Sequence, residues 1–495
     1  MASYVSLSNY SGTLRIPEFK GLNQYGDGIG LDPRYAMEAS NALTTEGVLR
    51  PMGEHVLMPQ TLPAPIETLA RLYRRWHTDN DDEREILIAA SAGQLYWAFP
   101  HSEAWAQIPL PAEWPGDQYE LNTWSYVNYE INPDESDASI DVILLSNAKD
   151  GMIMVRGDDL TAHIVPTPKK FGVITRHAER IWGGAIEGDP DMLVYSAPYD
   201  PFDWEQDDEY PEDGAGDVLQ PSWDGDSFMA LVPFGSQLIA LKRNRVWRIL
   251  GTNPGEYTFK EQYGGGTPYP NSIAVDGSRI LMLGRDGLLQ YNGENVAPYY
   301  QEYASDLWRR LNTFAADRSF ACKFRDCYYC AVPLDGSEEN NAVVIYNTEE
   351  RTWLLREGVK VEAFLPAEDA LYYTSSTTPG MLWEWKDESE KAMPLRWVSG
   401  WQDFGRLNMS KGGWQIYLTV ECEQEVALRV SIQTEKKLKT KAITFSPAED
   451  GKMPKQRRMV FGGNGRRFRI ILEADGGVMW RLIGGLQIEA ETDMG

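Results

Sequence analysis

Seven short segments, which we call cassettes, recur along this chain, and they constrain its fold more than any single motif does. Each cassette consists of an apolar run, a turn and a second apolar run. From Ile86 to Ala370 they span 284 residues in six intervals, which gives a mean spacing close to 47. Apolar runs of this length, split by Gly, Asn, Asp or Ser, indicate strand–turn–strand units. The cassettes are ILIAASAGQLYWAF from Ile86, VILLSNAKDGMIMV from Val142, MLVYSAPYDPFDW from Met192, LIALKRNRVWRI from Leu238, ILMLGRDGLLQYN from Ile280, CYYCAVPLDGSEENNAVVIYN from Cys327 and ALYYTSSTTPGMLWEW from Ala370.

This period fits the roughly 40–50 residues of a four-stranded propeller blade. The chain is therefore predicted to be all-β, with a β-propeller of about seven blades; six blades, or an array of β-sandwiches, are the alternatives. Because propellers close their ring with a strand from the N-terminus, we expect the closing strand within residues 41–57, which turn at Glu46-Gly47. The one helix expected is SDLWRRLNTF, with Ser305 as its N-cap and Leu307, Trp308 and Leu311 on a shared face.

The charge of the chain is unevenly distributed. Residues 394–495 carry 16 Lys and Arg against 12 Asp and Glu, whereas residues 1–393 carry 31 against 61, so the net charges are +4 and −30. The charged stretch KDESEKAMP also interrupts the strand pattern at residues 386–394. We therefore predict an N-terminal arm with propeller-closing strands (1–58), a propeller (59–388) and a C-terminal unit (389–495).

Long alternating strands dominate the C-terminal unit. Ile416, Leu418 and Val420 alternate with polar residues, as do residues 426–432 and 468–472, which is typical of half-buried antiparallel sheet. About 100 residues of such strands predict a jelly-roll-like β-sandwich. The lysine-rich segment KKLKTKAITF is predicted to be a solvated edge strand, with a partner contact as the alternative.

Motifs of known chemistry are lacking in the sequence. The five histidines, His55, His77, His101, His163 and His177, form no HxH, HExxH or HxxxH pair, and neither a GxSxG elbow nor a phosphate-binding P-loop occurs. The four cysteines, Cys322, Cys327, Cys330 and Cys422, are expected to be core residues and not a disulfide framework or metal site. We thus predict no enzyme, no cofactor, and no catalytic, cofactor-binding or metal residue.

Two further segments partly match motifs of known chemistry. Ser376 to Trp383 matches the sialidase-type Asp box S-x-D-x-G-x-x-W except that Thr378 replaces the aspartate, so we interpret it as a turn. The acidic segment Asp200–Asp217 lacks regular calcium-loop spacing and is expected to be a solvated loop. No apolar stretch approaches the ~18 residues of a membrane span, and no basic-then-apolar leader begins the chain.

The middle of the chain resembles a known family. ERIWGGAIEGDPDMLVYSAPYDPFDW from Glu179 and MALVPFGSQLIALKRNRVWRILG from Met229 are similar to segments of tailed-phage virion propellers. PNSIAVDGSRILMLGRDGLLQYNG from Pro270 fits a following blade, and EGVLRPMGE resembles the element before the first blade, although Met52 departs from the usual basic residue. Trp182, Trp204 and Trp247 end or begin strands in the cassettes, so they are expected to be packing residues between neighbouring sheets and not ligand platforms.

The nearest group is the packaged-DNA stabilisation, or tail hub and nozzle, proteins. The resemblance implies a structural virion protein, made in the host cytoplasm, whose identical subunits form a ring around the DNA channel of the phage tail. Other tail or portal-adaptor proteins would be its partners, and an acidic surface suits passage of DNA during ejection without sequence-specific binding. The alternative is a carbohydrate- or receptor-binding propeller at the tail tip, of the kind that a degraded glycosidase-like module would provide.

Overall fold

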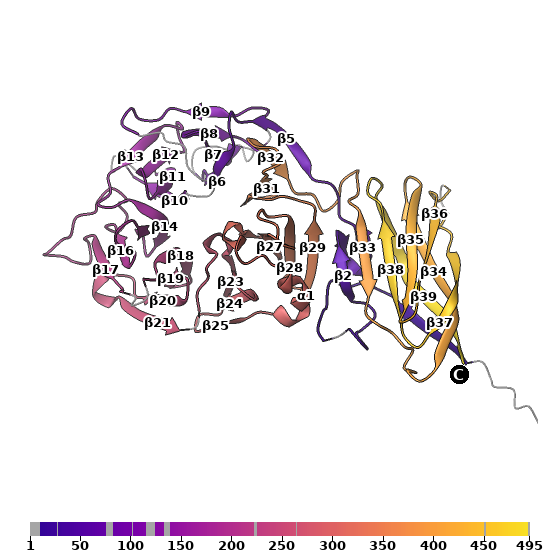
Figure 1. Ribbon diagram of the computed structural model, residues 1–495. Helices are drawn as coiled ribbons and strands as arrows, with labels where there is room; N and C mark the ends of the chain where they lie inside the picture. Colours follow the sequence, from indigo (N-terminus) through magenta and orange to yellow (C-terminus); the bar gives the residue numbers. More distant parts are fainter. Residues whose placement is uncertain are drawn as a thin grey trace, which may run out of the picture.

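Seven four-stranded antiparallel sheets stand around a ring in the computed structural model of this protein (Figure 1). The structure describes residues 10–26, 28–75, 83–100, 102–114, 124–132, 139–221, 225–263, 265–449 and 452–493. Six of the sheets are built from four consecutive strands, and the seventh takes one strand from the N-terminal part of the chain. This topology is consistent with a β-propeller of seven blades, as the cassette spacing predicted.

The blades follow one another in chain order. The first three are β6 (Ile66–Tyr73), β7 (Glu85–Ser91), β8 (Gln94–Ala98) and β9 (Ala106–Ile108); β10 (Ser125–Ile131), β11 (Ile140–Asn147), β12 (Gly151–Arg156) and β13 (Ala162–Val165); and β14 (Phe171–His177), β15 (Arg180–Ile186), β16 (Met192–Tyr195) and β17 (Gly216–Leu219). The next two are β18 (Phe228–Phe234), β19 (Gln237–Lys242), β20 (Arg245–Leu250) and β21 (Thr258–Tyr263); and β22 (Ala274–Asp276), β23 (Arg279–Gly284), β24 (Gly287–Tyr291) and β25 (Val296–Pro298). The last two are β26 (Phe320–Phe324), β27 (Cys327–Val332), β28 (Ala342–Asn347) and β29 (Thr352–Glu357); and β30 (Ala363–Pro366), β31 (Leu371–Thr374), β32 (Met381–Glu384) and β5 (Val56–Thr61).

Each central strand buries both of its faces. In β7, Ile86 and Ile88 pack into the cluster shared with the second blade, whereas Leu87 and Ala89 pack into the cluster shared with the seventh blade. The same division recurs around the ring, so every pair of neighbouring blades has its own apolar cluster. Burial on both faces explains why the cassettes read as continuous apolar runs and not as alternating ones.

Six of the seven cassettes are the two middle strands of a blade. The third one differs, because Met192 to Tyr195 is strand β16 but the residues after it form a long loop that reaches β17. The middle pair of that blade is β15 and β16, which lie on either side of Gly188. The prediction that the cassette from Met192 is a hairpin was therefore wrong, although its blade exists.

The ring closes through β5, which pairs antiparallel with β32. The predicted closing segment, residues 41–57, only begins this strand; its larger part forms a small hairpin of β3 (Ala42–Leu43) and β4 (Arg50–Pro51) around the 3₁₀ turn η1 (Thr45–Gly47). The expected turn at Glu46-Gly47 is confirmed, but the closing strand lies later in the chain. In the seventh blade, the indole nitrogen of Trp383 donates to the Thr378 hydroxyl at 2.7 Å, so the incomplete Asp box is a pinned turn.

His55, directly before β5, lies in an aromatic cluster between the last two blades. Its Nδ1 is 2.8 Å from the Tyr373 hydroxyl, and its ring centroid is 4.1 Å from that of Trp385. The Arg356 guanidinium lies 5.8 Å from the Trp385 ring and is buried, which lowers the pKa of this arginine to about 10. The pKa of His55 is held well below 6.5, mainly because burial disfavours the charged imidazolium and to a smaller extent because the positive charge of Arg356 lies nearby.

Two further sheets contain the C-terminal part of the chain, and both begin with a strand from the N-terminus. The five-stranded sheet has the order β2 (Ala36–Ser40), β33 (Leu395–Ser399), β38 (Phe468–Ala474), β35 (Val426–Thr434) and β36 (Leu438–Phe445). The four-stranded sheet has the order β1 (Tyr10–Ile16), β39 (Trp480–Asp493), β34 (Ser410–Cys422) and β37 (Arg457–Gly465). The N-terminal arm thus supplies β1 and β2 to these sheets, a pairing that no pattern in the sequence predicts.

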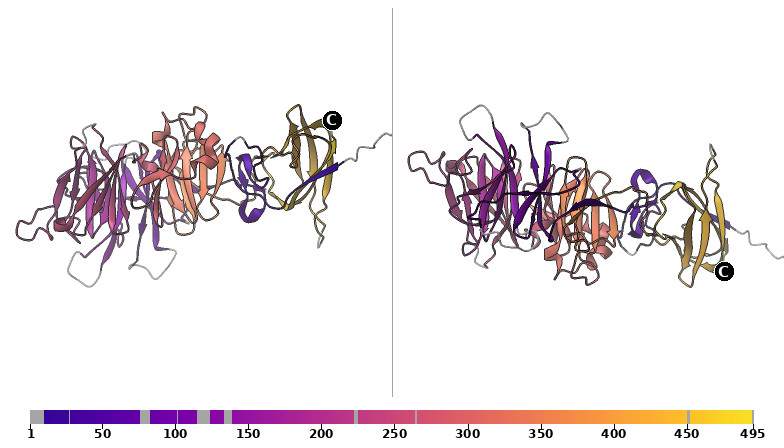
Figure 2. Two further views of the ribbon diagram at one scale, coloured as in Figure 1. Left: turned by 90° about the horizontal axis from the view of Figure 1, so that it is seen from below. Right: turned by 90° about the horizontal axis from the view of Figure 1, so that it is seen from above.

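The C-terminal sheets extend the molecule to one side of the ring (Figures 1 and 2). Strand β2 stands at the edge nearest the sixth blade, and β36 stands at the other edge of the same sheet (Figure 1). One apolar cluster runs from the fifth and sixth blades, through N-terminal residues such as Phe19 and Leu22, into both sheets. The ring and the C-terminal sheets therefore share a continuous core.

We expect Trp182→Ala to lower the free energy of unfolding by about 3–5 kcal/mol, because the side chain is fully buried between the third and fourth blades. Trp204 and Trp247 pack partly buried against interblade clusters, in agreement with the sequence prediction. Denaturant unfolding of the purified chain measures this change. Phe314→Ala is the matched control, since that side chain is 97% exposed and its loss is expected to cost less than about 0.5 kcal/mol.

We also expect the stability of the ring to fall as the pH drops below about 6.5. The pKa of His55 is lower in the folded chain than in the unfolded chain, so the unfolded chain takes up a proton on this imidazole at a higher pH. The neutral His55 therefore contributes its full stabilisation above the unfolded-state pKa, and this stabilisation is lost as the pH falls toward the folded-state pKa. Burial lowers the pKa of His177 in the same direction. Melting temperatures between pH 8 and pH 5 should decline less steeply in His55→Gln; an unchanged slope would contradict this assignment.

Candidate functional site: the junction between ring and C-terminal sheets

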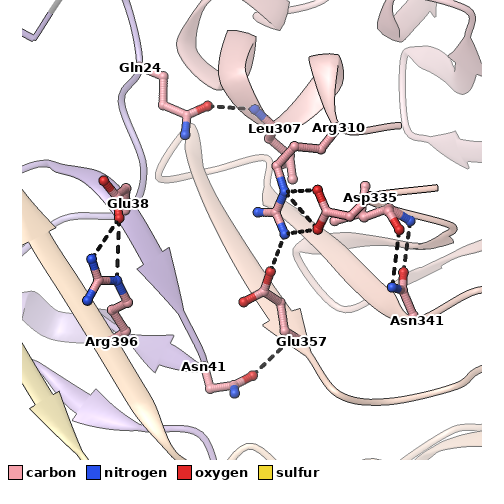
Figure 3. Close-up of polar contacts among 10 residues, drawn as sticks. Gln24, Glu38, Asn41, Leu307, Arg310, Asp335, Asn341, Glu357 and Arg396 are labelled. Atoms are coloured by element: carbon pink, nitrogen blue, oxygen red, sulfur yellow. Dashed lines mark hydrogen bonds and ion pairs between the residues drawn. The ribbon is translucent and has the colours of Figure 1, made fainter. Parts of the chain in front are cut away.

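A dense polar site lies at the junction, where residues 17–26 and 28–54 run between the sixth blade and the C-terminal sheets. We use this name for Leu22, Gln24, Glu38 and Asn41 together with their partners in the ring and in the C-terminal sheets. A cleft of about 350 Å³ opens here between Glu38, Arg396 and the Arg310–Glu357 pair. Figure 3 shows how these side chains meet from three separate parts of the chain.

The backbone of Leu22 connects the two halves of the molecule. Its N–H donates to the carbonyl of Trp353 in β29 at 2.8 Å, and the next residue, Asn23, donates to Ala36 in β2, also at 2.8 Å. The preceding glycine allows this approach, since a Cβ at Gly21 would lie 2.3 Å from the Trp353 carbonyl oxygen. A single extended segment thus links the outer strand of the sixth blade with the edge of the C-terminal sheet.

Asn41 makes four hydrogen bonds at the centre of the junction. Its side-chain oxygen accepts from the N–H of Glu357 at 2.8 Å, and its amide nitrogen donates to the carbonyl of Pro394 at 3.0 Å. Its backbone donates to Leu355 and accepts from Met52, both at 2.8 Å. The residue is buried with a φ of 53°, a conformation that asparagine tolerates better than most residues. One side chain therefore joins the ring, the N-terminal segment and the start of the C-terminal unit.

Gln24 caps the short helix α1 (Ser305–Arg309). Its side-chain oxygen accepts from the N–H of Leu307 at 3.0 Å, and its amide nitrogen donates to the Met37 carbonyl at 2.9 Å. The prediction that Ser305 is the N-cap was wrong: Ser305 lies inside the helix and its hydroxyl donates to the Gln24 carbonyl at 3.1 Å. The cap comes from the N-terminal segment because α1 packs directly against it. Leu307, Trp308 and Leu311 are buried, as the sequence predicted.

Two arginines carry the charge of the cleft. Arg310 forms a forked contact with Asp335, with nitrogen–oxygen distances of 3.0 and 2.7 Å, and reaches Glu357 at 2.5 Å (Figure 3). Hydrogen bonding to Arg310 lowers the pKa of Asp335. Across the cleft, Arg396 pairs with Glu38 at 3.1 Å and with Glu473 at 2.5 Å. Both guanidinium groups are thus committed to carboxylates, so the cleft is suited to holding its walls together and not to binding an anion.

The linker after the last blade is also held. The N–H of Gly53 donates to the Asp387 carbonyl, that of Glu54 to Lys391, and that of Met393 to Met52, each at 2.8 Å. Arg50 forms an ion pair with Glu388. The segment 386–394, which the sequence predicts to be a boundary, is therefore joined to residues 50–54 by hydrogen bonds and an ion pair.

The described histidines and the four cysteines do not meet at one place. His55 and His177 are buried in different blades, His163 is exposed on β13, and His77 and His101 lie outside the described residues. Cys322, Cys330 and Cys422 are buried, Cys327 is partly buried, and all four are free thiols. Within the described ranges, no group of three His, Cys, Asp or Glu side chains is placed to hold a metal ion. In the same ranges, no helix has the length and apolar character needed to cross a membrane.

Comparison with known proteins leaves the family open. No family model matches the sequence, and no curated protein matches it. Among solved structures, the chain is similar to BBS1N in complex with ARL6DN (9% identity, TM-score 0.41, covering 68% of this chain and 97% of that one). It is also similar to YCF48 bound to D1 peptide (10%, 0.41, 70% and 97%) and to BamB from Moraxella catarrhalis (12%, 0.34, 67% and 100%). Because these TM-scores are low, the propeller assignment depends on the strand topology.

We expect Asn41→Ala to destabilise the protein, by about 1–3 kcal/mol for each buried group left without its hydrogen bond. Asn41→Gly keeps the positive φ but removes both side-chain bonds, and Asn41→Asp keeps the acceptor for Glu357 but cannot donate to Pro394. Denaturant unfolding should rank the free energies of unfolding as wild type, then Asp, then Gly and Ala. Equal stability of all four chains would show that the junction does not depend on this side chain.

Proposed function

We propose that this chain is a structural protein of a tailed-phage virion, one subunit of a ring around the DNA channel in the hub, nozzle or adaptor region of the tail. In this role it retains and guides packaged DNA. The junction is the observation that carries the proposal. A subunit that maintains a channel under load needs its parts fixed to one another, and here hydrogen bonds, ion pairs and a continuous core all cross from ring to C-terminal sheets.

The C-terminal unit fits this proposal as a jelly-roll-like β-sandwich. Ile416, Leu418 and Val420 of β34 are buried, as are Leu428 and Val430 of β35 in the other sheet, and all five belong to one apolar cluster. We infer that the two sheets stack through these faces. The division proposed is residues 59–388 for the propeller and 389–495 for the sandwich, with strands β1 and β2 of the N-terminal arm completing the latter.

The distribution of charge supports passage of DNA without capture. Residues 1–393 carry a net charge of −30, and an acidic surface weakens contact with a phosphate backbone. The resemblance of residues 179–251 to virion propellers points to the same role. Other tail or portal-adaptor proteins are the expected partners, and the virion is the expected location.

One observation favours the alternative of a carbohydrate- or receptor-binding propeller. A cleft of about 440 Å³ between the second and third blades is lined by Tyr199, Phe202, Asp200 and His163, and the Tyr199 side chain is 74% exposed. Exposed aromatic rings beside polar groups suit sugar rings. Glycan binding by the isolated monomer, lost in Tyr199→Ala, would favour this function over the structural one.

We expect the isolated chain to be monomeric or weakly associated at low salt, because like-charged propellers repel one another, and to form a cyclic ring within the particle. Mass measurement of the purified chain and symmetry determination in intact particles check both parts. A single asymmetric copy in the particle, or particles that lack the protein, would contradict the structural role.

A further inference from the structure

A strongly basic edge ends the C-terminal sheets on the side away from the ring. Strands β36 and β37 are the last strands of their sheets, and among the described residues no strand pairs with their outer edges. Residues 436–467 contain ten Lys and Arg and only two Asp and Glu. Lys441 of β36 lies 5.7 Å from the Phe461 ring of β37, so the two edges adjoin. We call this surface the basic edge, after Lys439, Lys441, Arg457 and Arg458 on its two strands.

The basic edge is more than a strand protected by lysines. Every residue of β36 from Leu438 to Ala442 is exposed, so this part of the strand is uncovered on both faces. Apolar side chains lie among the cations: Leu438 is 55% exposed, Val460 of β37 is 46% exposed and Met453 between the strands is 80% exposed. Apolar groups beside charges are typical of protein–protein contacts, whereas DNA-binding surfaces are more polar.

A surface of opposite charge lies at the other end of the molecule. The segment of residues 200–217, which comprises most of the loop after β16 and the start of β17, carries nine Asp and Glu and no Lys or Arg. It extends from the third blade at the end of the ring remote from the C-terminal sheets (Figures 1 and 2). Its carboxylates form no ion pair with any described residue, and Phe202 and Tyr210 are exposed among them. We call this segment the acidic loop.

The base of the acidic loop is held in place by a buried arginine. Arg180 of β15 donates to the carbonyls of Ser196 at 2.8 Å and Gly214 at 2.6 Å, and also to that of Glu212. The N–H of Ala215 donates to the Glu205 carbonyl at 2.8 Å. A loop fixed at its base presents its charges in a defined place, which lowers the entropy lost when a partner binds.

We propose that the basic edge of one copy binds the acidic loop of the next copy. The two surfaces are complementary in charge, each carries exposed apolar side chains, and they lie at opposite ends of one subunit (Figure 1). A contact between different surfaces of identical subunits is heterologous, and it closes into a ring when the rotation between subunits fits. The inference rests on the proposed ring function and names the contact that joins neighbouring subunits.

Disulfide cross-linking of full-length chains tests the contact directly. A Lys439→Cys chain is mixed at high concentration with an Asp208→Cys chain and oxidised. We expect a covalent dimer at a yield at least tenfold above that of the control mixture of Lys439→Cys with Glu350→Cys, which places the thiol on an exposed acidic position of the sixth blade. Equal yields from the two mixtures would overturn the proposal.

Charge reversal provides a second test that does not need cysteine. At high protein concentration the wild-type chain should show weak association in sedimentation experiments. K439E/K441E and D207K/D208K, each alone, should abolish it, and mixing the two variants should restore a dimer. The matched control K149E/K170E reverses two exposed lysines on other loops and should associate as the wild type does. Circular dichroism confirms that each variant is folded. Association that survives both reversals would contradict the contact.

Two outcomes separate this inference from the proposed function. If the protein is found as a ring in particles but the Lys439→Cys and Asp208→Cys chains do not cross-link, the proposed contact is wrong and the proposed function stands. If the pair cross-links but the protein is absent from particles, the contact stands and the function is wrong. Binding of a fluorescent DNA duplex that K439E/K441E abolishes, without any self-association, would instead assign the basic edge to nucleic acid.

Discussion

Burial of the central blade strands on both faces is the constraint on which the rest of this structure depends. Strands such as β7 and β11 carry apolar side chains on both sides, so each sheet needs a neighbour on each side. A row of such sheets would leave an apolar face uncovered at each end, and closing the ring removes both. The closing strand β5 begins at Val56, so the described residues before it leave the ring next to the last blade.

The consequence is that the N-terminal segment becomes the connection between the two parts of the molecule. It leaves the ring beside the linker that leads to the C-terminal sheets, and it pairs with both. Asn41 and Gln24 then satisfy backbone groups on β29, on α1 and at Pro394 that would otherwise be buried without partners. Ring closure and the rigid junction are thus two results of the same chain path.

The path of the chain also sets where the charges lie. Because β2 takes the edge of the five-stranded sheet that faces the ring, β36 is left at the outer edge with its lysines. The acidic loop lies far from this edge, since the third blade stands on the opposite side of the ring (Figure 1). Opposite charges at the two ends of one subunit favour contacts between copies over contacts within one copy.

The sequence by itself determined the all-β class, the repeating hairpins and the apolar clusters between blades, because these depend on local turn residues and on side chains a few positions apart. It also located the turn at Glu46-Gly47 and the buried face of Leu307, Trp308 and Leu311. Only the tertiary structure decided that β1 pairs with β39, that Gln24 caps α1 and that Asn41 joins Glu357 to Pro394. These partners lie hundreds of residues apart, and a hydrogen bond between distant segments leaves no periodic pattern in either of them.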